Sequence, residues 1–198
     1  MKFTTLTLLA GVAASVSAAA LTPKAAALEK FNLEVSSWDS RLNGKSITAS
    51  NNKLKVSLSD STEDEGCNGP ATLFVQYQAL FLYNGDYESF QQVAVDRSED
   101  GQDQLQYFTN LHGKPQPFQI KPWSVDEYSR NLLFGDVLLG LTSFWACPDS
   151  NNEDTLSIYL DSGFGEPAGQ HDCVILQLKT VPQGAPQACE YSEFNNHP

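Results

Sequence analysis

Short runs in which apolar and polar residues alternate recur along most of the chain. In residues 31–35 the apolar positions are Phe31, Leu33 and Val35, and polar residues stand between them. Successive side chains of a β-strand point to opposite faces of a sheet, so this period of two predicts strands with one buried face. The same alternation recurs in further runs, most of them followed closely by Gly, Pro, Asn or Asp: residues 45–50, 53–58, 72–77, 79–85, 90–95, 105–108, 118–120, 131–135, 142–147, 155–160 and 173–179.

The number and spacing of these runs predict the fold class. No run longer than a turn or two shows the periodicity of an amphipathic helix. About a dozen short strands in one chain predict an all-β fold, either a single antiparallel barrel or a β-sandwich. A recurring rhythm of Gly or Asn followed by Leu-x-Phe or Leu-x-Val favours a β-trefoil-like barrel over the sandwich.

The first residues have the pattern of a secretory signal peptide. Lys2 makes a basic start, an uncharged apolar stretch runs from Leu6 to Val16, and small residues precede a cleavage point after Ala18. The apolar stretch is too short to span a bilayer. We therefore expect an exported protein with a signal peptide over residues 1–18, a flexible lead-in over 19–30 and a single β-rich domain over 31–198.

Four cysteines follow the expected signal peptide: Cys67, Cys147, Cys173 and Cys189. An even number of cysteines in an exported chain, with no C-x-x-C pair, predicts disulfides; we expect no metal site and no cofactor. Three pairings are open. We favour Cys147 with Cys173 and Cys67 with Cys189, because "WAC" and "CVILQLK" both have the pattern of core strands that lie side by side.

The formal net charge of -12 narrows the classes of partner. Binding to nucleic acid phosphates or to an anionic membrane surface needs clustered Lys and Arg, and the sequence has no basic cluster. We expect neither nucleic acid nor a membrane as a partner. The acidic residues gather in "DSTEDEG", "DRSEDGQD" and "DSNNEDT", which is typical of solvated loops between strands.

One acidic run lies inside "VAVDRSEDGQDQLQYF", between two strand-like segments. Asp96, Ser98, Asp100 and Gly101 stand at the first, third, fifth and sixth positions of a calcium-loop pattern. An EF-hand also needs an acidic residue at the twelfth position between helices, and this chain has Tyr107 there between strands. We favour a solvated hairpin turn, with Gly101 supplying a positive φ and with Asp96 and Ser98 bonding the turn backbone.

The sequence does not single out a catalytic centre. Glycoside hydrolases use a pair of carboxylates, but among 24 Asp and Glu residues no pair can be nominated. The chain has no G-x-S-x-G nucleophile motif, and His112 and His171 lie in polar, glycine-containing segments typical of surface loops. We therefore expect no enzyme, and a secreted glycoside hydrolase with an unidentified carboxylate pair stays the alternative.

The three tryptophans are candidates for stacking on sugars, because exposed aromatic faces suit pyranose rings. Trp145 in "SFWACP" is better explained as a core residue packed beside the Cys147 disulfide. Trp38 in "SSWDSRLNG" and Trp123 in "KPWSVDEY" lie among polar residues. They are the better platform candidates, although half-exposed tryptophans also close the ends of barrels.

Three segments together resemble a known family: "QQVAVDRSEDGQDQLQYFT", "NLLFGDVLLGLTSFWACP" and "LSIYLDSGFGEPAGQHDCVILQLKTV". They are similar to segments of the small secreted fungal cell wall proteins of the PhiA type, several of which are described as IgE-binding antigens. The residues that match the most distinctive segment are Asp96, Arg97, Ser98, Gly101 and Gln102, and Cys147 and Cys173 match the family's cysteines. The chain departs from the pattern at Asp100 and Glu166.

The resemblance implies a non-enzymatic protein of the fungal cell wall, with wall polysaccharide (β-glucan, chitin or mannan) as the expected partner. A secreted module that binds a host or competitor protein is a further alternative. No catalytic residue carries over from the family. If Asp100 is not shared, the turn is a structural corner in which Asp96 bonds either Arg97 or the turn backbone.

The cysteine pattern generates a first prediction. The exported protein should contain no free thiol under denaturing conditions, because both cysteine pairs are oxidised, and its far-ultraviolet circular dichroism should be that of a β-protein. Thiol titration before and after reduction measures the first property. Free thiols in the unreduced sample, or a helical spectrum, would contradict the architecture.

Overall fold

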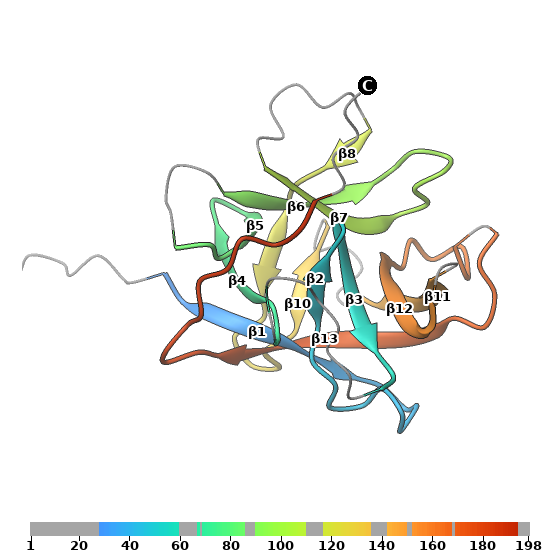
Figure 1. The fold of residues 1–198 in the computed structure, drawn as a ribbon. Helices are drawn as coiled ribbons and strands as arrows, with labels where there is room; N and C mark the ends of the chain where they lie inside the picture. The colour runs from blue at the N-terminus through green and yellow to red at the C-terminus, as the bar shows by residue number, and fades with distance from the viewer. Residues whose placement is uncertain are drawn as a thin grey trace, which may run out of the picture.

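A computed structural model describes residues 28–59, 67, 69–85, 90–109, 117–135, 142–149, 152–167 and 169–193. Over these ranges the regular structure consists of strands, which confirms the all-β prediction (Figure 1). The signal peptide expected over residues 1–18 lies outside the described residues, as does most of the lead-in expected over 19–30. Within the same ranges the structure has no helix that is long and apolar enough to cross a bilayer.

The strands in chain order are β1 (Lys30–Ser36), β2 (Thr48–Ser50), β3 (Lys53–Ser57), β4 (Thr72–Gln76), β5 (Ala79–Leu82), β6 (Gln91–Asp96), β7 (Gln104–Thr109), β8 (Phe118–Gln119), β9 (Trp123–Val125), β10 (Leu132–Phe134), β11 (Phe144–Asp149), β12 (Asn152–Leu160) and β13 (Val174–Pro182).

The strand pairings close into a circuit. Antiparallel pairing runs from β6 through β5, β4, β1, β13, β11 and β12 to β7, and β7 pairs with β6 again. β3 pairs with both β12 and β7, β2 extends β3, β8 extends β6, and β9 with β10 forms a separate pair. A closed circuit of this kind is a barrel, which removes most free sheet edges. The threefold arrangement of a trefoil stays a prediction.

Alternation of side chains builds the core of this barrel. In β1 the inward residues Phe31, Leu33 and Val35 are at most 2% exposed, while the residues between them are partly exposed. In β13 the inward residues include Leu178, and the outward residues include Ile175. The period of two in the sequence therefore corresponds to the inside and the outside of one closed sheet.

Strand β9 was not among the predicted runs, and its position corrects one candidate residue. Trp123 is 1% exposed, and its ring centroid lies 4.5 Å from that of Phe134 in β10. The backbone N–H of Trp123 donates to the carbonyl oxygen of Gln78 at the β4–β5 turn (2.8 Å). Trp123 is a core residue, so the prediction that it offers a sugar-binding surface is wrong.

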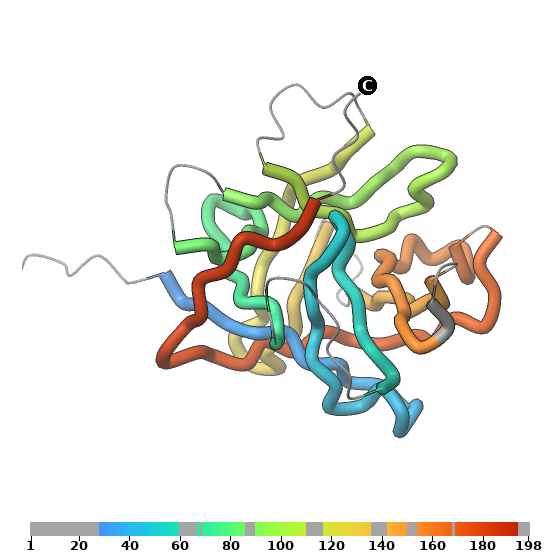
Figure 2. Tube along the Cα trace, in the orientation of Figure 1, coloured from blue at the N-terminus to red at the C-terminus, as the bar shows by residue number. Residues whose placement is uncertain are grey.

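The structure pairs Cys67 with Cys189 and Cys147 with Cys173, which is the pairing that the sequence pattern favours. Cys147 lies in β11, and Cys173 immediately precedes β13, the neighbour of β11. The Cys67–Cys189 disulfide belongs to the segment after β13, here called the C-terminal strap (residues 183–193). Figure 2 shows the strap crossing one side of the barrel toward β6 and β7.

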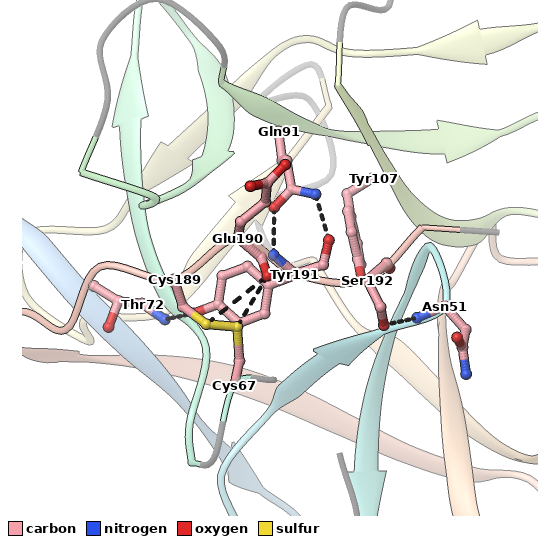
Figure 3. Close-up of a disulfide and its surroundings, with 9 residues drawn as sticks. All are labelled: Asn51, Cys67, Thr72, Gln91, Tyr107, Cys189, Glu190, Tyr191 and Ser192. Carbon is pink, nitrogen blue, oxygen red and sulfur yellow. Dashed lines mark hydrogen bonds between the residues drawn. A yellow bond between two sulfur atoms is a disulfide. The ribbon is translucent and has the colours of Figure 1, made fainter. Parts of the chain in front are cut away.

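Hydrogen bonds from buried side chains hold the strap in place (Figure 3). Gln91, which is 1% exposed, accepts from the backbone N–H of Tyr191 (2.9 Å) and donates to its carbonyl oxygen (2.7 Å). The Tyr191 hydroxyl accepts from the backbone N–H of Thr72 in β4 (3.0 Å). The Tyr107 hydroxyl donates to the carbonyl oxygen of Ser192 (2.5 Å). The strap is therefore fastened to strands β4, β6 and β7 of the barrel.

Burial of Tyr191 generates a prediction about alkaline stability. Burial raises the pKa of the Tyr191 phenol above its ordinary value of 10.0, and the hydrogen bond from Thr72 partly offsets this. A raised pKa means that the stabilising contribution is complete below the unfolded pKa of about 10 and is lost as the pH rises through the folded pKa. The free energy of unfolding should therefore fall above about pH 10.

Tyr191→Phe tests this prediction. Near neutral pH it should lower the free energy of unfolding by about 1–3 kcal/mol, because the buried N–H of Thr72 loses its acceptor. Above about pH 10 its stability should fall less steeply than that of the wild type, because one raised pKa is gone. Urea unfolding at a series of pH values measures both effects. If the free energies of unfolding of the variant and the wild type fell with the same slope at alkaline pH, the assigned role of Tyr191 would be contradicted.

Candidate functional site

The acidic turn between β6 and β7 is organised around the carboxylate of Asp96, which is 7% exposed. Its Oδ1 accepts from the backbone N–H of Ser98 (3.0 Å) and from the Ser98 hydroxyl (2.7 Å). Its Oδ2 accepts from the side-chain amide of Gln106 (3.0 Å). The Ser98 hydroxyl oxygen also accepts from the backbone N–H of Gly101 (2.8 Å). Of the two expected partners of Asp96, Arg97 or the turn backbone, the structure shows a hydrogen bond to the turn backbone.

Gly101 is required for a different reason from the predicted one. Its φ is not in the positive range, and the positive values occur at Gln102 (49°) and Asp103 (70°). A Cβ atom at position 101 would lie 2.0 Å from Cγ of Asp96. The expectation that Gly101 supplies a positive φ is therefore wrong, and the close approach of the Asp96 carboxylate explains the absence of a side chain.

Arg97 points away from the Asp96 carboxylate and ties the turn to neighbouring elements. Its Nη1 lies 2.6 Å from Oδ1 of Asp103, and its Nε donates to the side-chain oxygen of Gln119 in β8 (2.9 Å). Nη1 also donates to the hydroxyl of Ser162, which follows β12 (3.2 Å). Because Arg97 connects three segments that are distant in sequence, its role here is structural.

In the part of the chain that the structure describes, the acidic turn does not gather the ligands of a calcium site. The calcium-loop position Asp100 is exposed, and within the described ranges no group of three or more His, Cys, Asp or Glu side chains is placed to hold a metal ion. His171 is exposed, and His112 lies outside the described residues. Buried Asp149 faces Lys53 (3.5 Å) and Lys55 (3.7 Å), which is a structural ion-pair network.

Trp38 stands at the edge of a surface hollow beside the end of β1. Its side chain is 79% exposed, an unusual exposure for a residue of this size. The hollow has a volume of about 290 Å³ and is lined by neutral residues: Ser36, Ser37, Trp38, Ser143, Ile175, Leu176 and Gln177. These residues come from the end of β1, the start of β13 and the residue before β11.

A second tryptophan lies on the same side of the sheet. Trp145 in β11 is paired directly with Ile175 in β13 and with Tyr159 in β12. The neighbours of Trp145 along the chain, Phe144 and Ala146, point into the core and are fully buried, whereas Trp145 is only partly buried on the outside. The expectation that Trp145 is a core residue is therefore wrong. We call Ser36, Trp38, Ser143, Trp145, Ile175 and Gln177 the Trp38 face.

The loop after β1 presents Trp38 in a defined conformation. The Asp39 carboxylate binds both the guanidinium (2.6 Å) and the backbone N–H (2.9 Å) of Arg41. The hydrogen bond from the Arg41 side chain is the main reason why the pKa of Asp39 lies below its usual range. The hydroxyl of Ser37 donates to the carbonyl oxygen of Ile175 (3.2 Å), which fastens the loop to β13.

The polar side of this face is also held in place. Ser36 and Gln177 are directly opposite each other in the β1–β13 pairing. Gln177 Oε1 accepts from the side-chain amide of Asn131 (3.2 Å), the residue immediately before β10, and this hydrogen bond fixes the Gln177 side chain. An ordered row of neutral hydrogen-bonding groups beside aromatic rings is suited to an uncharged, hydroxylated ligand.

A model of the PhiA-like secreted protein family matches residues 31–192, which include all the strands of the barrel apart from Lys30 of β1. The chain belongs to this family. The resemblance carried by the Asp96 turn and the cysteine segments is thereby confirmed.

Curated relatives cover nearly the full length. "Cell wall protein phiA" of Emericella nidulans is 30% identical over 196 residues, covering 97% of this chain and 100% of the relative. The protein of the same name from Aspergillus fumigatus is 27% identical, covering 98% of this chain and 100% of the relative. The one from Arthroderma benhamiae is 25% identical, covering 93% of this chain and 99% of the relative. No solved structure matches the chain.

The contact between Gly101 and Asp96 generates a double-mutant prediction. Asp96→Ala should cost about 1 kcal/mol or more, because it removes an acceptor shared by three hydrogen bonds. Gly101→Ala should cost about 1–3 kcal/mol through the clash with the carboxylate. In the Asp96→Ala background the same change should cost about 1 kcal/mol less, because the clashing atoms are gone. Additive effects in urea unfolding would show that the two residues do not press on each other.

Proposed function

We propose that this PhiA-like protein is a non-catalytic component of the fungal cell wall that binds wall polysaccharide through the Trp38 face. The curated relatives named as cell wall proteins support the location. The observation that carries the binding site is the exposed indole of Trp38 beside a hollow lined by neutral polar groups. Polysaccharides of the wall are hydroxylated chains whose pyranose rings stack on aromatic faces.

Exposure of Trp38 has an energetic cost that a ligand would remove. An indole ring carries a large apolar area, and each Å² taken out of water contributes roughly 25 cal/mol. The loop that carries Trp38 is fixed by Asp39, Arg41 and Ser37, so little side-chain and backbone freedom is lost when a ring stacks there. A preformed and exposed aromatic surface of this kind is a common feature of binding sites.

Charge favours a neutral ligand. The whole chain has a net charge of -12, which repels anionic polymers, whereas the hollow beside Trp38 is lined by uncharged side chains. Neutral hydroxyl and amide groups hydrogen-bond sugar hydroxyls without the desolvation penalty of a buried charge. Binding without hydrolysis agrees with the structural roles of the buried aspartates: Asp39 is paired with Arg41, Asp96 holds a turn, and Asp149 faces two lysines.

Co-sedimentation with insoluble β-glucan, chitin and mannan tests the proposal. The wild-type protein should sediment with at least one of them and release no reducing sugar. Trp38→Ala should weaken the binding about tenfold or more, because it removes the stacking surface. Its thermal stability should stay close to that of the wild type, because the ring makes little contact with the core.

Tyr128→Ala is the matched control, since Tyr128 is another exposed aromatic residue (96%) on a turn outside the Trp38 face. It should sediment like the wild type. Absence of sedimentation with all three polymers would contradict polysaccharide binding, and release of reducing sugar would favour the hydrolase alternative. Equal losses in both variants would show that general surface hydrophobicity, and not this face, causes retention.

A further inference from the structure

We propose that Trp145 forms a second stacking position, so that the Trp38 face binds an extended, neutral, β-linked glycan that crosses strands β1, β13 and β11. This inference rests on the proposed function and specifies the length and the chemistry of its ligand. Trp145, which was expected in the core, is in this proposal a further binding residue.

The strand order places the two tryptophans on either side of one residue. Trp38 and Ile175 line the same hollow, and Ile175 is paired directly with Trp145 on the next strand. Ile175 is 36% exposed, and Trp145 is partly exposed with its indole nitrogen covered, so Trp38, Ile175 and Trp145 stand in one row across the outside of the sheet. Strands lie about 4.8 Å apart, so β1 and β11 are separated by about 10 Å. This separation is close to the length of a disaccharide in an extended chain.

A polar row runs beside the row of Trp38, Ile175 and Trp145. Ser36 is directly opposite Gln177, and the pairing of Phe144 with Leu176 brings the preceding residue Ser143 next to Gln177. Because Oε1 of Gln177 accepts from Asn131, its amide NH2 group is left as the donor on this side chain. Aromatic rings under the sugar faces and hydrogen-bonding groups along one edge would suit a single chain lying across the strands.

The chemistry of the face selects the class of glycan. In β-linked chains of glucose or N-acetylglucosamine the ring substituents are equatorial, so both faces of each ring are flat and can stack on an indole. Because the residues that line the hollow beside Trp38 are uncharged, a ligand needs no charge to bind there. The shared chemistry is therefore an uncharged, β-linked chain with equatorial substituents, which β-glucan and chitin both supply and which mannan, with its axial hydroxyl, does not.

The three tryptophans provide a direct test. In ¹⁵N-labelled protein each indole N–H gives one signal, assigned by the variants Trp38→Phe and Trp145→Phe. The protein is titrated with soluble β-glucan and chitin oligosaccharides of one to six sugar units, and with mannose oligosaccharides. The signals of Trp38 and Trp145 should both shift once the ligand has two or three units, while buried Trp123 stays unchanged as an internal control. Affinity should rise roughly fivefold or more between one and three units, because a second aromatic contact is added.

Separate outcomes distinguish the two proposals. If only Trp38 shifts at every chain length, and Trp145→Phe and Gln177→Ala bind like the wild type, the second position is wrong and the Trp38 site stands. If no oligosaccharide of any class shifts either signal, and the insoluble polymers also fail to retain the protein, both proposals fail. Tighter binding of mannose oligosaccharides would overturn the assigned ligand class. The relative affinities for the other two series show which source supplies the ligand.

Discussion

The antiparallel pairing between the first and the last strands, β1 and β13, is the constraint on which the rest of the structure depends. Six residue pairs from Phe31–Pro182 to Ser36–Gln177 join them, and this ladder lies between β4 and β11 in the circuit. Because side chains alternate, its register decides which residues enter the core and which face solvent. A slip of one residue would bury Gln177 and expose Leu178, so the apolar positions of both strands enforce the observed register.

The same register produces the Trp38 face. It places Ser36 beside Gln177 and fastens the Trp38 loop to Ile175, and the neighbouring β11–β13 pairing adds Trp145. The face therefore combines segments more than a hundred residues apart: Trp145, Ile175 and Gln177 lie on strands, which position binding groups accurately. Trp38 lies in a loop that a hydrogen bond from Ser37 fastens to β13.

Hydrogen bonds stabilise the Asp96 turn and the C-terminal strap in two different ways, one local and one between distant strands. The Asp96 turn satisfies its own backbone locally, through Ser98 and Gly101, and a local pattern of this kind is readable in the sequence. The C-terminal strap is satisfied by Gln91 and Tyr107 from distant strands and is tethered by a disulfide that spans 122 residues. Cross-linking so long a loop removes many conformations from the unfolded chain, on the order of 4–5 kcal/mol in the entropic account.

The alternation of apolar residues determined the all-β class and nearly every strand, because alternate positions meet opposite environments in any sheet. The alternation also indicates that Trp145 faces outward, since Phe144 and Ala146 on either side of it are the inward residues. The prediction for Trp123 failed because polar residues surround it in the sequence, whereas in the structure it lies in a short strand and its ring packs against Phe134. The need for glycine at 101 came from a carboxylate five residues away. Tertiary structure alone decided three features: the closure of the barrel, the course of the strap and the placement of Trp38 and Trp145 in one row. All three depend on which strands become neighbours. Packing across the whole core selects the pairing partners, and the local sequence pattern does not contain that information.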